Sequence, residues 1–174
     1  MKHILPIVTL TTLAAAASAQ SAAAAGLSYN RAGVNYNTDA TTLADGSSDN
    51  GYSLSAEALV GSSNVWVGAT ANLNKAGADS VSVGYLFKNV AAGIDATAFV
   101  GSNDVYGITL RRSLNEVVAG LEARFVWSQN GGSSNDTFVY ELAYNVGSKY
   151  QVAVSIEDAS NVAEQTSVTV RYNF

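Results

Sequence analysis

The stretch "SVTVRYNF", Ser167–Phe174, alternates polar and apolar residues to its last position. In an extended chain, alternate side chains point to opposite faces, so one face would carry the apolar residues Val168, Val170, Tyr172 and Phe174. The terminus of a soluble domain usually frays in polar residues, whereas here the last residue is a phenylalanine. The stretch therefore predicts a strand with one apolar face that is needed up to its final side chain.

The same two-residue period occurs along almost the whole chain after residue 26. In Tyr52–Ala58, for example, apolar residues occupy every second position and polar residues the positions between. We predict ten such strands, at 27–37, 51–60, 64–74, 79–88, 91–101, 104–114, 117–129, 136–146, 149–158 and 164–174. The count becomes eight or twelve if segments are wrongly joined or split, since boundaries are the weakest part of such a prediction. These strands have about the 9–11 residues that a tilted strand needs to cross a bilayer.

The segments between the predicted strands alternate in length. Two are long and polar, 38–50 and 130–135, and they follow the first and seventh strands. Short ones follow the even-numbered strands, at 61–63, 89–90, 115–116 and 147–148. Long loops at one end and tight turns at the other are typical of outer-membrane barrels with both termini in the periplasm.

The charged residues indicate which face of each strand would meet lipid. Nearly all charges within the strands fall opposite the aliphatic side chains: Arg31, Glu57, Asp95, Arg111, Glu122, Arg124, Glu141, Glu157 and Arg171. One clear exception is Arg112, which lies close to the expected turn at 115–116, where a long side chain can reach the headgroups. The charged face is therefore expected to line a barrel interior and the apolar face to contact lipid.

Aromatic residues concentrate near the strand ends. Traced up and down, the strands place one set near the long-loop rim: Tyr36, Tyr52, Tyr106, Phe125, Trp127, Phe138 and Tyr140. A second set falls near the short-turn rim: Tyr85, Phe87, Tyr144, Tyr150, Tyr172 and Phe174. Two girdles of aromatic residues are what bilayer interfaces favour. A soluble β-sandwich is the alternative, but it does not need aromatics at strand ends and small aliphatics between them.

The final strand carries a resemblance to a known family. With apolar residues at Val168, Val170 and Tyr172 and a terminal Phe174, it resembles the C-terminal strand of Gram-negative outer-membrane β-barrel proteins, which include small porin-like and opacity-type barrels. The resemblance implies an all-β fold, a closed antiparallel up-and-down transmembrane barrel. It also implies that the barrel-assembly machinery recognises this strand. Outer-membrane lipid and lipopolysaccharide would surround the barrel, and the oligomeric state stays open.

Residues 1–19 have the features of a secretory signal peptide. Lys2 and His3 precede an apolar stretch, and Ala17-Ser-Ala19 fits a cleavage site before Gln20. Cleavage after Ala25 fits as well. A short membrane anchor is the alternative, although the stretch is short and rich in threonine for a span. We expect residues 20–174 to be exported and to form one barrel domain in the bacterial outer membrane.

Composition excludes several classes of function. The chain has 9 basic and 14 acidic residues, and without Lys2 the net charge is 8 − 14 = −6, which argues against nucleic-acid binding. There is no cysteine, and the single histidine, His3, lies in the predicted signal peptide. Enzymes of this membrane generally use histidine as a general base. We therefore predict no catalytic residues, no metal and no cofactor.

The predicted interior holds both small and charged residues. Symmetric hairpins would place Arg124 opposite Glu141 and Arg31 opposite Glu57, whereas Asp95 and Glu157 would lack partners. Arg111 would approach Glu122 around the turn at 115–116. Two large side chains would also point inward, Trp66 near the short-turn rim and Phe99 near the long-loop rim.

Two functions are compatible with such an interior. The charges either brace the barrel as ion pairs or form a constriction that selects small solutes, as rings of charge do in pores. The first function is a narrow porin-like passive channel for small solutes or ions. The alternative is a closed structural or surface-interaction barrel, adhesin-like, that acts through its long extracellular loops.

Overall fold

The computed structural model describes residues 27–38, 51–73, 79–131, 135–160 and 162–174. The predicted signal peptide, 1–19, and the cleavage site after Ala25 lie outside these residues. All regular elements in the described ranges are strands: β1 Arg31–Thr38, β2 Gly51–Leu59, β3 Val65–Asn72, β4 Ser80–Ala91, β5 Ile94–Gly101, β6 Val105–Ser113, β7 Leu121–Asn130, β8 Asn135–Val146, β9 Tyr150–Ala159 and β10 Val162–Asn173. The same ranges contain no helix with the length and hydropathy of a membrane span.

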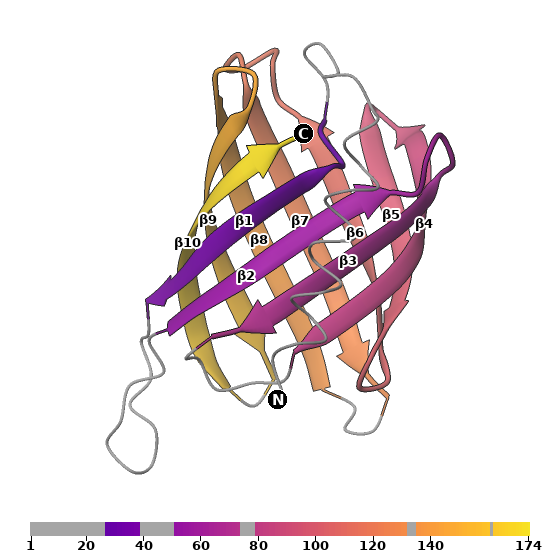
Figure 1. Ribbon diagram of the computed structural model, residues 1–174, viewed down its shortest axis with the longest axis vertical. Coiled ribbons are helices and arrows are strands. Elements are labelled where there is room, and N and C mark those ends of the chain that lie inside the picture. Colours follow the sequence, from indigo (N-terminus) through magenta and orange to yellow (C-terminus); the bar gives the residue numbers. More distant parts are fainter. Residues whose placement is uncertain (1–26, 39–50, 74–78, 132–134, 161) are drawn as a thin grey trace.

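The ten strands close into a single antiparallel barrel, as Figure 1 shows. Each strand pairs with its neighbours in sequence, and β1 completes the ring by pairing with β10 from Arg31 opposite Asn173 to Thr38 opposite Thr166. Closure leaves no strand edge with unpaired backbone groups, which is the condition for a sheet to exist in hydrocarbon. The predicted fold class and the count of ten strands are confirmed.

The connections lie at two ends of the barrel. The turn end holds the C-terminus and the connections 60–64, 92–93, 114–120 and 147–149, and it is uppermost in Figure 1. The loop end holds the connection 102–104 and the strand ends at Thr38, Gly51, Asn72, Ser80, Asn130, Asn135, Ala159 and Val162. The connections at the two ends of the barrel differ less in length than the sequence predicts. Residues 130–135 are not a long loop, because Asn130 pairs with Asn135 and only 131–134 connect the strands.

Two of the predicted turns lie elsewhere in the structure. The turn expected at 89–90 lies at Ala92-Gly93, where both residues have positive φ, so β4 extends to Ala91. The turn expected at 115–116 is the longer connection 114–120, and β7 begins at Leu121 rather than at residue 117. Local hydrogen bonds explain the second difference, since Val117 N donates to Leu114 O over 2.9 Å and Gly120 N to Asn115 Oδ1 over 2.7 Å.

Side chains are distributed inside out relative to a soluble protein. On the outer face Val34 is 47% exposed and Leu142 57% exposed, whereas inward-facing Arg31 and Gln151 are only 2% and 1% exposed. A water-soluble domain places apolar side chains in the core and charges outside. The barrel therefore has an exterior suited to lipid and an interior made of polar groups.

The predicted aromatic girdle residues lie on the outer face and contact one another between strands. At the loop end the rings of Tyr36 and Tyr52 are 5.0 Å apart, and at the turn end those of Tyr150 and Tyr172 are 5.6 Å apart. Phe174 lies against Tyr172 at 6.4 Å, and its backbone N donates to Asn30 O over 3.0 Å. The final side chain is thus held at the turn-end rim.

Candidate functional site

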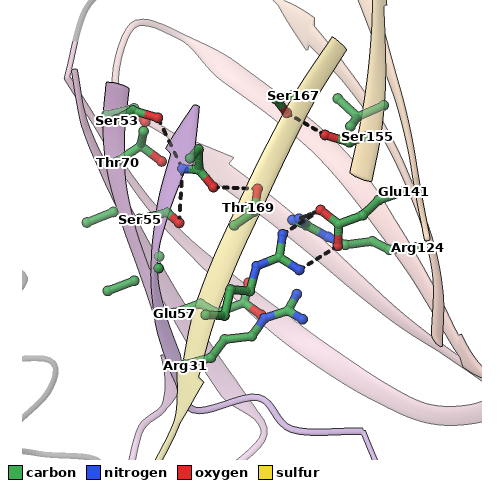
Figure 2. Close-up of a pocket in the computed structure, with 18 of the residues that line it drawn as sticks. Arg31, Ser53, Ser55, Glu57, Thr70, Arg124, Glu141, Ser155, Ser167 and Thr169 are labelled. Atoms are coloured by element: carbon green, nitrogen blue, oxygen red, sulfur yellow. Dashed lines mark hydrogen bonds and ion pairs between the residues drawn. The ribbon is translucent and has the colours of Figure 1, made fainter. Parts of the chain in front are cut away.

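The lumen contains a cavity of about 280 Å³, here called the vestibule. Small polar residues at alternate positions of several strands form much of its wall: Asn35, Ser53, Ser55, Thr70, Ser82, Ser155, Ser167 and Thr169. Asn35 links three of them, because its Nδ2 donates to Ser53 Oγ over 3.0 Å and to Ser55 Oγ over 3.3 Å, and its Oδ1 accepts from Thr169 over 2.8 Å. Short side chains leave the space, and their polar groups make it suitable for water or a polar solute (Figure 2).

Charged side chains bound the vestibule on the side of the turn end. We call them the charged layer: Arg31, Glu57, Arg111, Glu122, Arg124, Glu141 and Arg171. Glu141 accepts two hydrogen bonds from Arg171, one of them 2.7 Å long, in the bidentate geometry that favours arginine–carboxylate pairs. Arg124 Nη1 approaches the same carboxylate to 3.8 Å (Figure 2).

The rest of the charged layer is a continuous network. Arg31 Nε pairs with Glu57, and Arg111 Nε pairs with Glu122 over 2.7 Å. Cross-contacts of 3.5 Å between Arg31 and Glu122 and 3.4 Å between Arg111 and Glu57 join the two pairs. Gln151 joins the network to the Glu141 pair, since its Oε1 accepts from both Arg31 and Arg171 over 3.0 Å.

The sequence predicted contacts between neighbouring strands correctly but missed contacts between strands that are not neighbours. The register places Arg31 opposite Glu57 and Arg124 opposite Glu141, as symmetric hairpins imply. The main partner of Glu141 is nevertheless Arg171, which lies two strands away on β10. Gln151 was also missed, because a neutral amide at an inward position gives no signal of its own in the sequence.

Two glycines make room for large inward side chains. A Cβ on Gly33 would lie 2.8 Å from Cγ of Arg171, and a Cβ on Gly68 would lie 2.5 Å from the Trp66 ring. Both distances are shorter than normal carbon–carbon contacts. Arg171 and Trp66 therefore occupy space that any larger residue at these two positions would take.

Trp66 and Phe99 do not lie at opposite rims, and that prediction is wrong. Their ring centroids are 6.0 Å apart. The reason is the stagger of tilted strands, since Trp66 and Phe99 both pair with Gly84 of β4, from either side. A row of paired residues runs obliquely across tilted strands, so it joins a residue near the turn end of β3 to one near the loop end of β5.

Residues Leu27–Asn30, predicted as the start of the first strand, instead fill the turn end of the lumen. We call them the N-terminal plug. The Tyr29 ring is 9% exposed and packs in an apolar cluster with Leu59 and Leu86, against which Leu27 and Trp66 also lie. The plug therefore lies next to the charged layer on the side away from the vestibule.

Polar contacts also hold the plug. Arg111 Nη2 donates to Ser28 O over 2.7 Å, and the Arg111 guanidinium lies 4.5 Å from the Tyr29 ring centroid. The Tyr29 hydroxyl donates to Asp95, and burial raises the pKa of this phenol above its ordinary value, so it keeps its proton. Leu59 N donates to Asn30 Oδ1 over 3.0 Å.

The two carboxylates expected to lack partners differ. Asp95 accepts hydrogen bonds from the Tyr29 hydroxyl and from Asn89 N, the latter over 2.7 Å, so the prediction is wrong for this residue. The missing information was the position of the plug, which the sequence pattern assigned to a strand. Glu157 lines the vestibule, and within the described part of the chain no side chain pairs with it.

The side chains of the lumen are suited to bind a polar solute or to select it by charge. Its ionised groups are arginine and carboxylate side chains, and those of the charged layer pair with one another. Among the described residues, no group of three or more His, Cys, Asp or Glu side chains is placed to hold a metal ion.

Comparison with solved structures finds proteins of similar architecture. The barrel shares the fold of KdgM porin. A structure of KdgM porin in complex with disordered oligogalacturonate matches with a TM-score of 0.52 and 10% sequence identity, over 83% of this chain and 99% of that chain. A second structure of KdgM porin has a TM-score of 0.49 at 10% identity and covers the same shares of the two chains. Neisserial surface protein A covers 83% of this chain and 95% of its own, with a TM-score of 0.28 and 12% identity.

At 10% identity, the likeness to KdgM porin is one of fold. No protein-family model matches the sequence, and no curated protein matches it.

Proposed function

We propose that the chain is an integral outer-membrane barrel that acts as a narrow porin-like passive channel for small solutes or ions. The observation that carries this proposal is a closed barrel with an apolar exterior whose polar lumen holds a vestibule of about 280 Å³ bounded by charge. A solute entering from the loop end would meet hydroxyl and amide groups first and the charged layer next. KdgM porin, which has this fold, is itself a porin.

The proposed orientation follows the common arrangement of such barrels. The turn end and both termini would face the periplasm, and the loop end would face the outside. Export by residues 1–19 and a surrounding of phospholipid and lipopolysaccharide belong to the same proposal. The charged layer would then lie below the external entrance and act as the constriction.

The proposal is tested by single-channel conductance of the refolded chain in a planar bilayer. Discrete current steps are expected. Replacing Arg124 with alanine should shift ion selectivity toward cations, because Arg124 lines the vestibule and is the most exposed arginine of the charged layer, at 21%. Lys149→Ala removes the same charge from the exposed 147–149 turn and should leave selectivity unchanged. Absence of current from a barrel shown to be folded would rule out the channel.

A closed surface-interaction barrel is the second candidate, and one observation favours it. The charged layer pairs internally and the N-terminal plug fills the turn end, so the lumen is obstructed at two adjacent levels. In that case function would reside in the external connections, above all 39–50, which lie outside the described residues. Replacing 39–50 with a short turn should then abolish binding to an external partner and leave the fold intact. We infer no catalysis from either candidate.

The C-terminal strand carries a separate prediction about assembly. Deleting Phe174 should strongly reduce the amount of barrel assembled in the outer membrane of cells, because we propose that the assembly machinery binds this strand. The purified variant should lose only about 1–2 kcal/mol of stability, since Phe174 is partly exposed at the rim. Quantifying folded barrel in membrane fractions, beside urea unfolding of the purified protein, checks both parts. Equal losses in cells and in vitro would contradict a recognition role.

A further inference from the structure

The outer face of the barrel is hollowed over β5–β9. An apolar groove of about 550 Å³ lies between outward side chains of these strands, among them Leu110, Ala123, Phe125, Tyr140, Leu142 and Val154. We propose that this groove binds one phospholipid of the turn-end leaflet, with an acyl chain in the groove and the phosphate on Arg112. The inference rests on the proposed membrane location and goes beyond the proposed channel.

The register shows that the groove runs obliquely. One row of outward residues follows the hydrogen-bonded pairs from strand to strand: Ile94, Arg112, Ala123, Leu142 and Val154. Ile94 is the first residue of β5, next to the turn end, whereas Val154 is at the middle of β9. The row therefore climbs from the turn-end rim to the middle of the barrel wall.

The row just described forms one wall of the groove. The other wall is the parallel row of outward residues one step closer to the loop end: Leu110, Phe125, Tyr140 and Ile156. Its large side chains stand beside the small side chain of Ala123, which deepens the groove near its centre. Five neighbouring strands spaced about 4.8 Å apart make a path of roughly 19 Å. One leaflet of the hydrocarbon core is about 15 Å thick. An oblique path of this length spans the leaflet once, as a single acyl chain does.

Charge distinguishes the two ends of the groove. Arg112 lies near its turn-end limit and is the basic side chain that borders the groove on the outer face. The aromatic girdle is interrupted there, because the turn-end outward residues of β5–β7 are Ile94, Arg112 and Leu121, whereas Tyr85 and Tyr144 flank the gap. An arginine in an interfacial gap is suited to bind a phosphate.

The ion pair between Arg112 and Glu116 does not prevent Arg112 from binding a phosphate. Arg112 Nη2 lies 2.6 Å from Glu116, but the two side chains are 43% and 53% exposed, and such surface pairs contribute little free energy. A guanidinium has five N–H donors, so it can bind a phosphate beside the carboxylate. A second copy of the chain fits less well, because it would present a convex barrel wall to a narrow concave groove.

Native mass spectrometry of the refolded protein, with phosphatidylglycerol in the detergent micelle, tests the proposal. The wild-type chain should retain one phosphatidylglycerol. Arg112→Gln should weaken its retention about tenfold, the loss expected for one charge-assisted contact. Ala123→Phe should fill the groove and abolish retention. Ala98→Phe, at an exposed outward position of β5 outside the groove, is the matched control and should bind like wild type.

Three results would overturn the proposal. Equal retention by the Ala123→Phe and Ala98→Phe variants would mean that the lipid is only annular. Equal retention of a diacylglycerol, which has no phosphate, would remove the role of Arg112. A dimer mass that Ala123→Phe abolishes would assign the groove to a second copy. The measurement is independent of current through the lumen, so a failed conductance experiment would leave the lipid result standing and contradict only the channel.

Discussion

Replacing Glu141 with glutamine is expected to destabilise the barrel by roughly 3 kcal/mol. Glu141 is 5% exposed, accepts two hydrogen bonds from Arg171 and lies 3.8 Å from Arg124. An amide of the same size would leave both guanidinium groups without their shared carboxylate. The loss of stability is large because a buried charge without a partner raises the free energy of the folded state by more than an intact buried pair lowers it.

The measurement is urea unfolding of the refolded barrel in lipid vesicles, followed by tryptophan fluorescence. Trp127 is on the lipid-facing side and Trp66 in the lumen, so the signal reports both environments. Glu157→Gln is the matched control: it removes an inward carboxylate that pairs with no described side chain, and should change stability by about 0.5 kcal/mol or less. Similar losses in the two variants would mean that burial of a carboxylate, and not the Arg171 pair, sets the cost.

Replacing Tyr29 with alanine should release the N-terminal plug and raise the conductance severalfold. The substitution removes the ring from its cluster with Leu59 and Leu86, the contact with the Arg111 guanidinium and the hydrogen bond to Asp95. Loss of a buried aromatic side chain costs about 3–5 kcal/mol. The contacts that remain with described residues include three hydrogen bonds to Ser28 and Asn30 and the packing of the partly buried Leu27. A hydrogen bond contributes only about 1 kcal/mol net, so we expect the plug to leave the lumen.

Single-channel recording of wild type, Tyr29→Ala and Tyr29→Phe checks this prediction. Tyr29→Phe keeps the ring and loses only the hydroxyl, so its conductance should stay close to wild type. A larger conductance in both variants would assign the effect to Asp95 and not to the plug. Unchanged current in both would place the resistance of the lumen entirely in the charged layer.

The alternating pattern predicted the fold and the strand count, because a period of two is the mark of a strand with two different faces. It also predicted the hairpin neighbours Arg31–Glu57 and Arg124–Glu141. These follow from symmetric turns alone. Contacts between strands that are not neighbours, such as Arg171 with Glu141 and Arg31 with Glu122, depend on the curvature and tilt of the closed sheet, which a linear pattern does not contain.

The errors have a similar origin. The contact between Trp66 and Phe99 arises from strand tilt, and the Leu27–Asn30 segment looks like a strand because its apolar residues also alternate. At 114–120, the Asn115 side chain and hydrogen bonds to Leu114 stabilise a local turn that interrupts an otherwise continuous pattern. In each case a tertiary or local contact outweighed the period of the sequence.

The charged layer has a consequence for the kinetics of folding. Arg31 reaches Glu122 and Gln151, which are 91 and 120 residues away in the chain, and Arg171 joins the same network from the opposite end. The contacts of Arg31 with Glu122 and Gln151 exist only after β1 meets β10, so an open sheet would lack them. We expect these closure contacts to form after the rate-limiting step, so that weakening them should speed unfolding while leaving the folding rate nearly unchanged. The charged layer would thus slow the opening of a closed barrel without speeding its closure.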